Sequence, residues 1–77
     1  MRIEVLGTGC AKCRKVEQII RDTVSKTGID AEVVHVSNLS EIVERGVMMT
    51  PAVIIDGVKK LEGKVPSEEQ VRGWLAK

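Results

Sequence analysis

The pattern of hydrophobic residues divides the chain into short alternating elements. A mainly apolar run that ends at a glycine loop predicts a first strand over Arg2–Leu6. Apolar residues three and four positions apart then predict a helix that begins at Cys10 or Ala11 and continues to Lys26. The remaining segments predict a strand over 31–36, a short helix after Asn38, strands over 52–55 and 58–61, and a final helix after Ser67.

Capping and turn residues support these boundaries. Asn38 can cap the short helix, and Ser67 with Gln70 has the spacing of a capping box. Asp56-Gly57, between two apolar runs, is a strong hairpin signal. The first strand–helix–strand unit predicts a parallel pair, to which the hairpin adds antiparallel strands. The sequence therefore predicts an α/β fold with a four-stranded mixed sheet and three helices, in the order β-α-β-α-β-β-α.

The composition predicts one domain over residues 1–77 and excludes several functions. A hydrophobic fraction of 43% and a net charge of +1 argue against disorder. Trp74 is the only aromatic residue, so the chain has no stacking platform for nucleic acid, and its charge offers no footprint for a polyanion. No segment resembles a signal peptide or is long enough to cross a membrane. We therefore expect a cytoplasmic protein with neither nucleic-acid nor membrane partners.

Two cysteines lie where the first strand gives way to the first helix. In Cys10-Ala11-Lys12-Cys13 the sulfurs are about one helical turn apart, a separation that suits a disulfide. A close pair in a reducing compartment indicates redox or metal chemistry. Cys10 stands at the helix start, where unpaired N–H groups and the helix dipole favour a thiolate, whereas Cys13 continues the buried face. Position therefore predicts that Cys10 attacks a partner disulfide and Cys13 resolves the mixed disulfide.

Basic residues crowd the beginning of this helix. Lys12, Arg14 and Lys15 precede its first acidic residue, Glu17, although cations there oppose the helix dipole. Such a local violation points to function. Basic neighbours lower the pKa of a thiol, so Lys12 inside the motif is the candidate for tuning it. Arg14 and Lys15 fit a solvated helix face equally well.

The motifs together resemble the thioredoxin fold. Gly7-Thr8-Gly9 leads into the C-x-x-C, Thr50-Pro51 precedes the hairpin, and a capped helix ends the chain. More narrowly, essentially the whole chain is similar to the small glutaredoxin-like or thioredoxin-like redox-active disulfide proteins of archaea and bacteria. The resemblance implies a protein-disulfide oxidoreductase, an electron carrier in cell redox homeostasis, with Cys10 as nucleophile and Cys13 as resolving thiol.

The resemblance also implies where a substrate binds. Pro51 would be cis, with the Thr50 backbone beside the sulfurs and paired with an extended substrate segment. Local sequence by itself favours a trans proline that opens a strand. Met48 and Met49 offer a pliable apolar contact surface to a partner, although ordinary loop or core packing is favoured for at least one of them.

The implied partners are protein disulfides and a thioredoxin-reductase-like enzyme that recharges a monomeric carrier. No bound cofactor is implied, because the Cys10–Cys13 dithiol carries the two electrons. A specialised donor to one reductase or metalloid-handling enzyme stays open. Ala11-Lys12 matches neither the usual thioredoxin nor the usual glutaredoxin dipeptide, so the redox potential is not carried over. The segment 63–67 lacks the Gly-Gly typical of glutathione-binding glutaredoxins, which leaves the use of glutathione open.

Glu4 stands six residues before Cys10, where thioredoxins place a buried acid. A carboxylate at this position could relay a proton to Cys13. A surface or strand-edge glutamate is nevertheless favoured, because burying the charge without a partner would be costly.

The strongest rival is a cytosolic soft-metal module. Two thiolates would suit Cu(I) binding or a metallochaperone. Such modules end on a strand and usually carry a methionine two residues before the first cysteine, where this chain has Thr8. A zinc site needs four ligands, and only Cys10, Cys13 and His35 are obvious. Because His35 is better explained as a sheet histidine, no metal site is predicted.

Overall fold

The computed structural model describes residues 1–9 and 11–76. Its elements follow the predicted order, and the fold is the expected thioredoxin-like α/β arrangement. Their bounds are β1 (Arg2–Leu6), α1 (Ala11–Thr27), β2 (Glu32–Val36), α2 (Leu39–Glu44), β3 (Ala52–Ile55), β4 (Val58–Glu62) and α3 (Glu68–Leu75).

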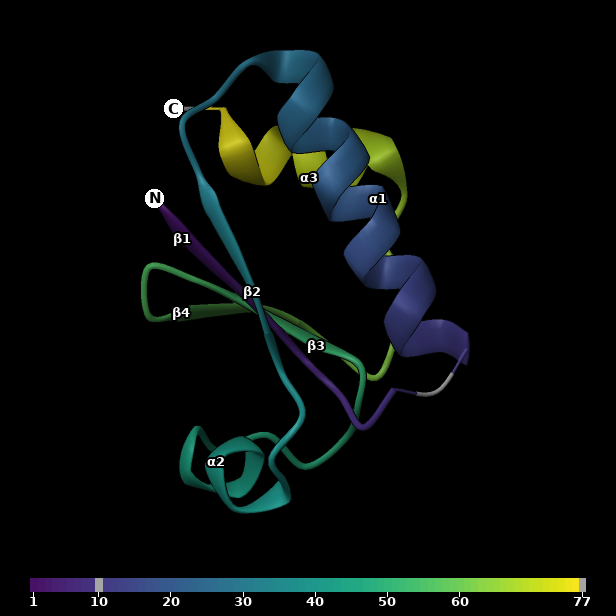
Figure 1. Cartoon of the computed structure of the whole chain (residues 1–77), viewed down its shortest axis with the longest axis vertical. Coiled ribbons are helices and arrows are strands. Elements are labelled where there is room, and N and C mark those ends of the chain that lie inside the picture. Colours follow the sequence, from purple (N-terminus) through teal and green to yellow (C-terminus); the bar gives the residue numbers. More distant parts are fainter. Residues whose placement is uncertain (10, 77) are drawn as a thin grey trace.

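The strand β1 lies inside the sheet, whose order is β2-β1-β3-β4. It runs parallel to β2, with Arg2 opposite Glu32, and antiparallel to β3. The β3–β4 pair is antiparallel, and its register shifts between Val53 and Ile54. Because β1 and β3 are antiparallel neighbours with Leu6 opposite Ala52, the loop that follows β1 and the loop that precedes β3 lie at the same end of the sheet (Figure 1).

Side chains on the two faces of the sheet enter two separate cores. Figure 1 shows α1 and α3 side by side on one face and α2 on the other. The α1/α3 core contains Ile3, Val5, Val16, Ile20, Val53, Ile55, Val71 and Leu75. The α2 core contains Leu6, Val36, Ile42, Val47, Ala52 and Ile54. Period-two alternation along β1 and β3 therefore supplies both cores from the same strands.

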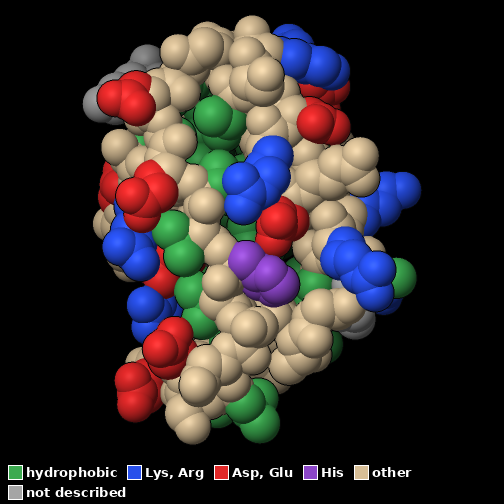
Figure 2. Space-filling model, in the orientation of Figure 1, with side chains coloured by type: hydrophobic (Ala, Val, Ile, Leu, Met, Phe, Trp, Pro, Cys, Tyr) green, Lys and Arg blue, Asp and Glu red, His purple; other side chains and the backbone are tan. Residues whose placement is uncertain are grey.

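The short helix α2 buries little of its apolar surface. Only Ile42 is buried among its residues, whereas Leu39 and Val43 are 66% and 64% exposed. Hydrophobic side chains are accordingly visible on the surface in the region of α2 (Figure 2). The helix is held at its start by Asn38, whose side chain accepts a hydrogen bond from the Glu41 N–H as predicted.

The hairpin and the last helix also follow their sequence signals. Asp56 and Gly57 both have positive φ, 49° and 84°, as a type I′ turn requires. The Asp56 carboxylate accepts a hydrogen bond from the Arg2 N–H at 2.7 Å, which fastens the hairpin to β1. Ser67 and Gln70 form the predicted capping box of α3. Among the described residues, none of the helices has the length and apolar character needed to cross a bilayer.

Candidate active site around Cys13 and Pro51

Cys13 lies near the start of α1 and is only 2% exposed. Its burial agrees with the expectation that the second cysteine continues the apolar face toward Val16 and Ile20, which are fully buried. Cys10, the predicted nucleophile, lies outside the described residues. The rest of the site is therefore built around the place where Cys13 meets the sheet.

Gly7, which directly follows β1, packs closely against Cys13. A Cβ placed on Gly7 would overlap Cys13 Sγ, lie 2.9 Å from Cys13 Cβ and lie 4.0 Å from Thr50 Cβ. The Gly7 N–H donates to the Val36 carbonyl at 3.0 Å, which holds the backbone at the end of the sheet. Only a residue without a side chain lets Cys13 pack here, and the same spot brings Thr50 close to Cys13.

The peptide bond between Thr50 and Pro51 is cis, the geometry that the resemblance implies. Pro51 is buried and Thr50 is exposed. The Pro51 carbonyl accepts a hydrogen bond from the Gly63 N–H at 2.7 Å. The segment therefore joins the sheet at Pro51 while Thr50, beside the Gly7–Cys13 contact, stays open to solvent.

Met48 and Met49 project from the loop before Thr50. Met48 is 93% exposed and Met49 is 63% exposed, so neither belongs to the core. Of the ordinary loop or core packing favoured for at least one of them, core packing is therefore not observed, whereas Met49 does make a local packing contact. Met49 does rest against Gly63, where an added Cβ would come within 3.2 Å of Met49 Cβ. Two flexible apolar side chains thus stand on the surface next to Thr50.

The backbone of this methionine loop is held by Glu62, at the end of β4. One carboxylate oxygen, Oε2, accepts hydrogen bonds from the Met48 N–H at 2.5 Å and the Met49 N–H at 3.1 Å. The other, Oε1, accepts from Lys59 Nζ at 3.0 Å. These contacts, the Met48 N–H first and then Lys59 and the Met49 N–H, lower the pKa of Glu62 from 4.5 to about 2.

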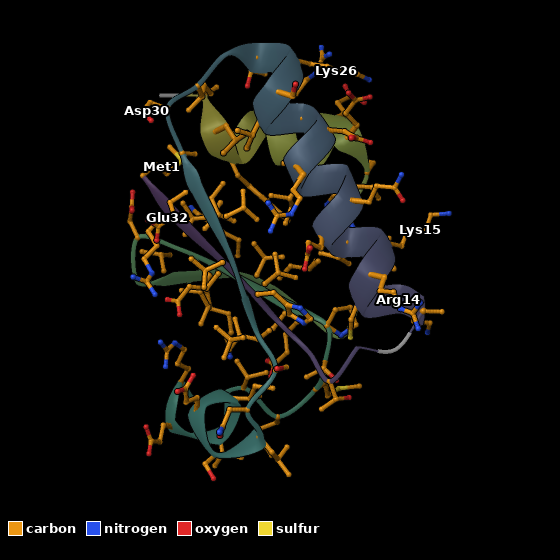
Figure 3. The ribbon with its side chains drawn as sticks, in the orientation of Figure 1. Met1, Arg14, Lys15, Lys26, Asp30 and Glu32 are labelled. Atoms are coloured by element: carbon orange, nitrogen blue, oxygen red, sulfur yellow. The ribbon has the colours of Figure 1, made fainter. Side chains whose placement is uncertain are left out.

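The basic residues near the start of α1 face solvent, and the first turn of this helix carries no acidic residue. Lys12, Arg14 and Lys15 are all exposed. Lys15 projects away from the body of the protein (Figure 3), whereas Arg14 turns back toward the loop before α1, where its Nε donates to the Gly9 carbonyl at 3.2 Å. Lys12 lies inside the motif, and its effect on the thiols stays a prediction.

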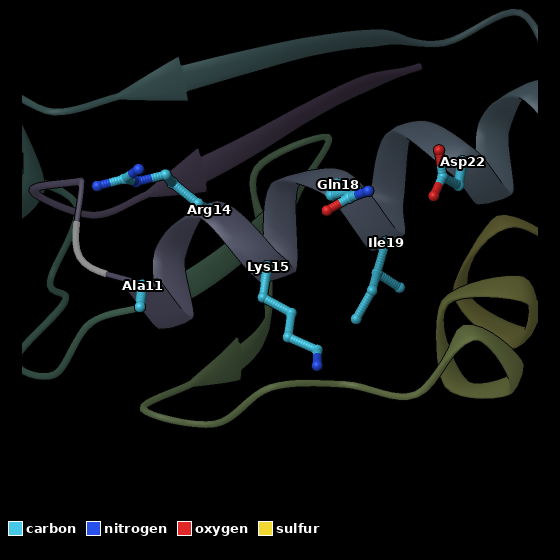
Figure 4. Close-up of a pocket in the computed structure, with 6 residues that line it drawn as sticks. All are labelled: Ala11, Arg14, Lys15, Gln18, Ile19 and Asp22. Carbon is cyan, nitrogen blue, oxygen red and sulfur yellow. The ribbon is translucent and has the colours of Figure 1, made fainter.

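A shallow groove follows the outer side of α1. Its lining includes Arg14, Lys15 and Asp22, whose charged groups point in different directions (Figure 4). Side chains that diverge in this way do not converge on one small ligand. The end of the sheet at Gly7 and Thr50 is therefore a better candidate site than this groove.

Glu4 is buried, contrary to the surface or strand-edge position favoured from sequence. It is 8% exposed, because β1 is an inner strand. Its carboxylate pairs with Arg45 Nε at 2.7 Å, and Arg45 caps the C-terminus of α2. The partner that offsets its burial thus comes from 41 residues further along the chain. Proton relay to Cys13 stays a prediction.

His35 takes part in the sheet, as expected for a sheet histidine. Its Nε2 lies 3.1 Å from the Gly7 carbonyl, and its Nδ1 lies 3.3 Å from a Glu17 carboxylate oxygen. The imidazole therefore links Glu17 of α1 to Gly7, the glycine that packs against Cys13. Within residues 1–9 and 11–76, no cluster of three histidine, cysteine, aspartate or glutamate side chains is arranged to hold a metal ion.

Two of these residues were not singled out by the sequence. Gly7 belongs to a glycine-rich loop, but the sequence does not show that its missing Cβ makes room for Cys13. Glu62 carries no signal at all, because its backbone partners lie 13 and 14 residues away across a loop. A glutamate that follows two lysines on a hairpin strand looks like ordinary surface charge.

A cis-proline loop placed beside a buried cysteine at the start of α1, on a four-stranded mixed sheet, defines a thioredoxin-like protein. Comparison with known proteins agrees. Residues 1–76 match the family model described as Thioredoxin domain, and the chain belongs to this family.

Two curated archaeal proteins are similar over nearly the whole chain. A thioredoxin of Methanothermobacter thermautotrophicus is 38% identical over 76 residues, which cover 99% of each chain. A thioredoxin of Methanocaldococcus jannaschii is 43% identical over 73 residues, which cover 95% of this chain and 84% of the relative. The family resemblance inferred from the motifs is confirmed, and membership supports a thiol–disulfide oxidoreductase role.

Proposed function

We propose that this protein is a thiol–disulfide oxidoreductase that exchanges electrons with protein disulfides through Cys10 and Cys13. The single observation that supports this most strongly is the meeting of Cys13, Gly7 and the exposed Thr50 ahead of a cis proline. An extended substrate segment can pair with the Thr50 backbone there, which would bring its disulfide to the motif.

The reaction follows from two unequal thiols. The Cys10 thiolate attacks one sulfur of the substrate disulfide, and the second substrate sulfur leaves as a thiolate that takes up a proton. Cys13, buried beside Gly7, then loses its proton and attacks the Cys10 sulfur. The substrate leaves as a dithiol, and the Cys10–Cys13 disulfide retains the oxidising equivalents. In this scheme the cysteine pair carries both electrons without a bound cofactor, and Lys12 favours the attacking thiolate.

The partners in this proposal are substrate proteins with accessible disulfides and a thioredoxin-reductase-like enzyme that returns the Cys10–Cys13 pair to the dithiol. A monomer in the cytoplasm, where thiols are kept reduced, would be suited to such a cycle. The proposed substrate-binding residues are Met49, Thr50 and Pro51. Met49 and Thr50 are exposed next to the buried Pro51, so a substrate can reach them.

Trapping of the mixed disulfide tests the roles of the two cysteines. The Cys13→Ser variant should retain a disulfide-linked adduct with a substrate protein, because no second thiol releases it. The Cys10→Ser variant should form none. The adduct is measured by non-reducing electrophoresis and mass spectrometry. Adducts formed only by the Cys10→Ser variant would reverse the two roles.

A redox titration separates the proposed activity from soft-metal binding. In thiol–disulfide buffers the protein should pass through one two-electron transition, counted as zero or two alkylated cysteines by mass. A midpoint potential of about −270 mV would indicate a reductant, and a midpoint potential of about −120 mV would indicate an oxidant. Cysteines that stay reduced in every buffer, and are protected only by added Cu(I) or zinc, would replace the oxidoreductase with a metal module.

A further inference from the structure

The exposed methionine loop, Met48–Thr50, is attached to β4 through polar contacts rather than through its own side chains. Met48 is almost fully solvent-exposed and Met49 is largely so. The nearest buried anchors are Val47 on one side and Pro51 on the other. The shape of the segment between them therefore depends on what holds its backbone.

Glu62 holds it at two successive amides. The N–H groups of Met48 and Met49 converge on the same oxygen, Oε2, an arrangement in which consecutive backbone donors enclose one anion. Hydrogen bonds to a carboxylate are stronger than those between neutral groups. Since both amides point inward to Glu62, the two methionine side chains are turned toward solvent.

Lys59 and Gly63 complete the attachment. Lys59 Nζ donates to Glu62 Oε1 at 3.0 Å and lies 3.5 Å from the Gly46 carbonyl, so it connects β4 to the segment that precedes the methionine loop. Gly63 donates to the Pro51 carbonyl at 2.7 Å and leaves room for Met49. Among the described residues, Lys59 is the charged side chain that the structure places in contact with the Glu62 carboxylate.

We propose that Glu62 is a positioning residue for protein substrates, which fixes the backbone of Met48 and Met49 so that their side chains and Thr50 form a ready docking surface beside Cys13. This inference rests on the proposed oxidoreductase function. A loop ordered before binding does not have to be ordered by the substrate, so removal of the carboxylate weakens docking and leaves the thiol chemistry unchanged. The low pKa of Glu62 agrees with a carboxylate that stays ionised in this role.

The test compares Glu62→Ala and Glu62→Gln with the native protein. Insulin serves as the protein disulfide and 2-hydroxyethyl disulfide as a small one that needs no docking surface, with dithiothreitol as electron donor. For Glu62→Ala we expect KM for insulin to rise about tenfold while kcat is retained, and for Glu62→Gln, which keeps an acceptor oxygen, to rise about threefold. The rate with the small disulfide should stay within about twofold of the native value.

Glu68→Ala is the matched control. Glu68 also carries an ion-paired carboxylate, with Lys26 at 2.8 Å, but it lies at the start of α3 on the other face of the sheet. Its removal should leave both disulfide assays unchanged. Amide hydrogen exchange at Met48 and Met49 gives a reading that does not depend on activity, and it should accelerate about tenfold or more in Glu62→Ala.

The outcomes separate the two proposals. Unchanged amide exchange at Met48 and Met49, or an unchanged KM for insulin in a protein that reduces both probes, overturns the positioning role only. Equal losses with insulin and with the small disulfide also overturn it, since the carboxylate would then act on the chemistry or the fold. A native protein that reduces neither probe refutes the oxidoreductase function and the positioning role together.

Discussion

The core between the sheet and α1 and α3 differs from the core under α2 in how it is closed. On the first face, the core contains eight buried apolar residues, four of which come from α1 and α3, and partly buried side chains such as Ile19, Val24 and Trp74 pack against it. On the second, the core contains six, of which α2 supplies only Ile42, and Val34 is the one partly buried hydrophobic residue among those described that packs against it. The α2 face is thus the thinner layer, and α2 leaves Leu39 and Val43 in solvent.

Charged groups take over where the apolar layer is thin. The Glu4–Arg45 pair ties the end of α2 to the inner strand β1, and the Glu62 carboxylate holds the loop that follows α2. On the α1/α3 face the ion pairs, such as Lys26–Glu68, are peripheral and exposed. The α1/α3 face therefore supplies most of the apolar stabilisation. The α2 face buries less apolar surface, and its polar contacts hold the loop that presents the candidate docking surface.

Truncation of one isoleucine on each face measures this difference most directly. Ile20→Ala on the α1/α3 face should lower the free energy of unfolding by about 4 kcal/mol, and Ile42→Ala on the α2 face by about 2 kcal/mol. The cavity that Ile20→Ala would leave is enclosed by the core, whereas the short helix α2 can shift to fill the space that Ile42→Ala would leave. Urea denaturation gives both values. Equal losses would show that the two cores contribute alike.

An added methyl group at Gly7 tests the contact that connects the first face to the site. In Gly7→Ala the new Cβ overlaps Cys13 Sγ, so we expect a loss of about 1–3 kcal/mol in unfolding free energy and impaired disulfide exchange. Gly73→Ala is the control, since a Cβ there meets nothing within 4 Å and should stabilise α3 by roughly 0.5–1 kcal/mol. A fully stable and active Gly7→Ala protein would contradict the close packing of Cys13.

Removal of Arg45 tests the polar framework of the second face. Arg45→Ala leaves the Glu4 carboxylate, whose side chain is 11% exposed, without its partner, and should cost about 1–3 kcal/mol in the free energy of unfolding. The double variant Glu4→Leu/Arg45→Leu should recover most of this loss, because no unpaired charge remains buried. Urea denaturation of both proteins checks the comparison. A double variant as unstable as Arg45→Ala would show that the ion pair is needed for more than neutralising Glu4.

Acid provides the mildest perturbation of the α2 face. The pKa of Glu62 is lowered from 4.5 to about 2 in the folded protein, mainly by the Met48 N–H, so the folded state holds this proton less readily than the unfolded one. Its stabilising effect is complete above pH 4.5 and is lost as the pH falls from there toward 2. The stability of the native protein should therefore fall more steeply over that window than that of Glu62→Gln. Parallel pH profiles would show that the carboxylate makes no such contribution.

The sequence was most informative where structure is decided locally. The bounds of β1, the Asn38 and Ser67 caps and the Asp56-Gly57 turn depend on residues within a few positions, and each was predicted correctly. The capped starts of α2 and α3 and the hairpin turn made it possible to predict the order of the elements. The C-x-x-C and Thr50-Pro51 motifs then indicated the thioredoxin fold.

Long-range placement accounts for what the sequence did not predict. Whether Glu4 is exposed depends on β1 becoming an inner strand and on Arg45 arriving from the end of α2. The exposure of Met48 and Met49 depends on Glu62, on the far side of the hairpin. Local physics also favoured a trans bond before Pro51, and only the resemblance to a family implied the cis form that the structure has.

The irregular register of β4 against β3 has a consequence for self-association. β4 is an outer strand of the sheet, so its unpaired backbone groups could template the addition of another chain. The register shift between Val53 and Ile54 makes this edge irregular, and the exposed side chains of Lys60 and of Lys59, which is paired with Glu62, add charged groups along it. The strand β4, which carries Glu62, thereby also discourages edge-to-edge aggregation of the protein at high concentration.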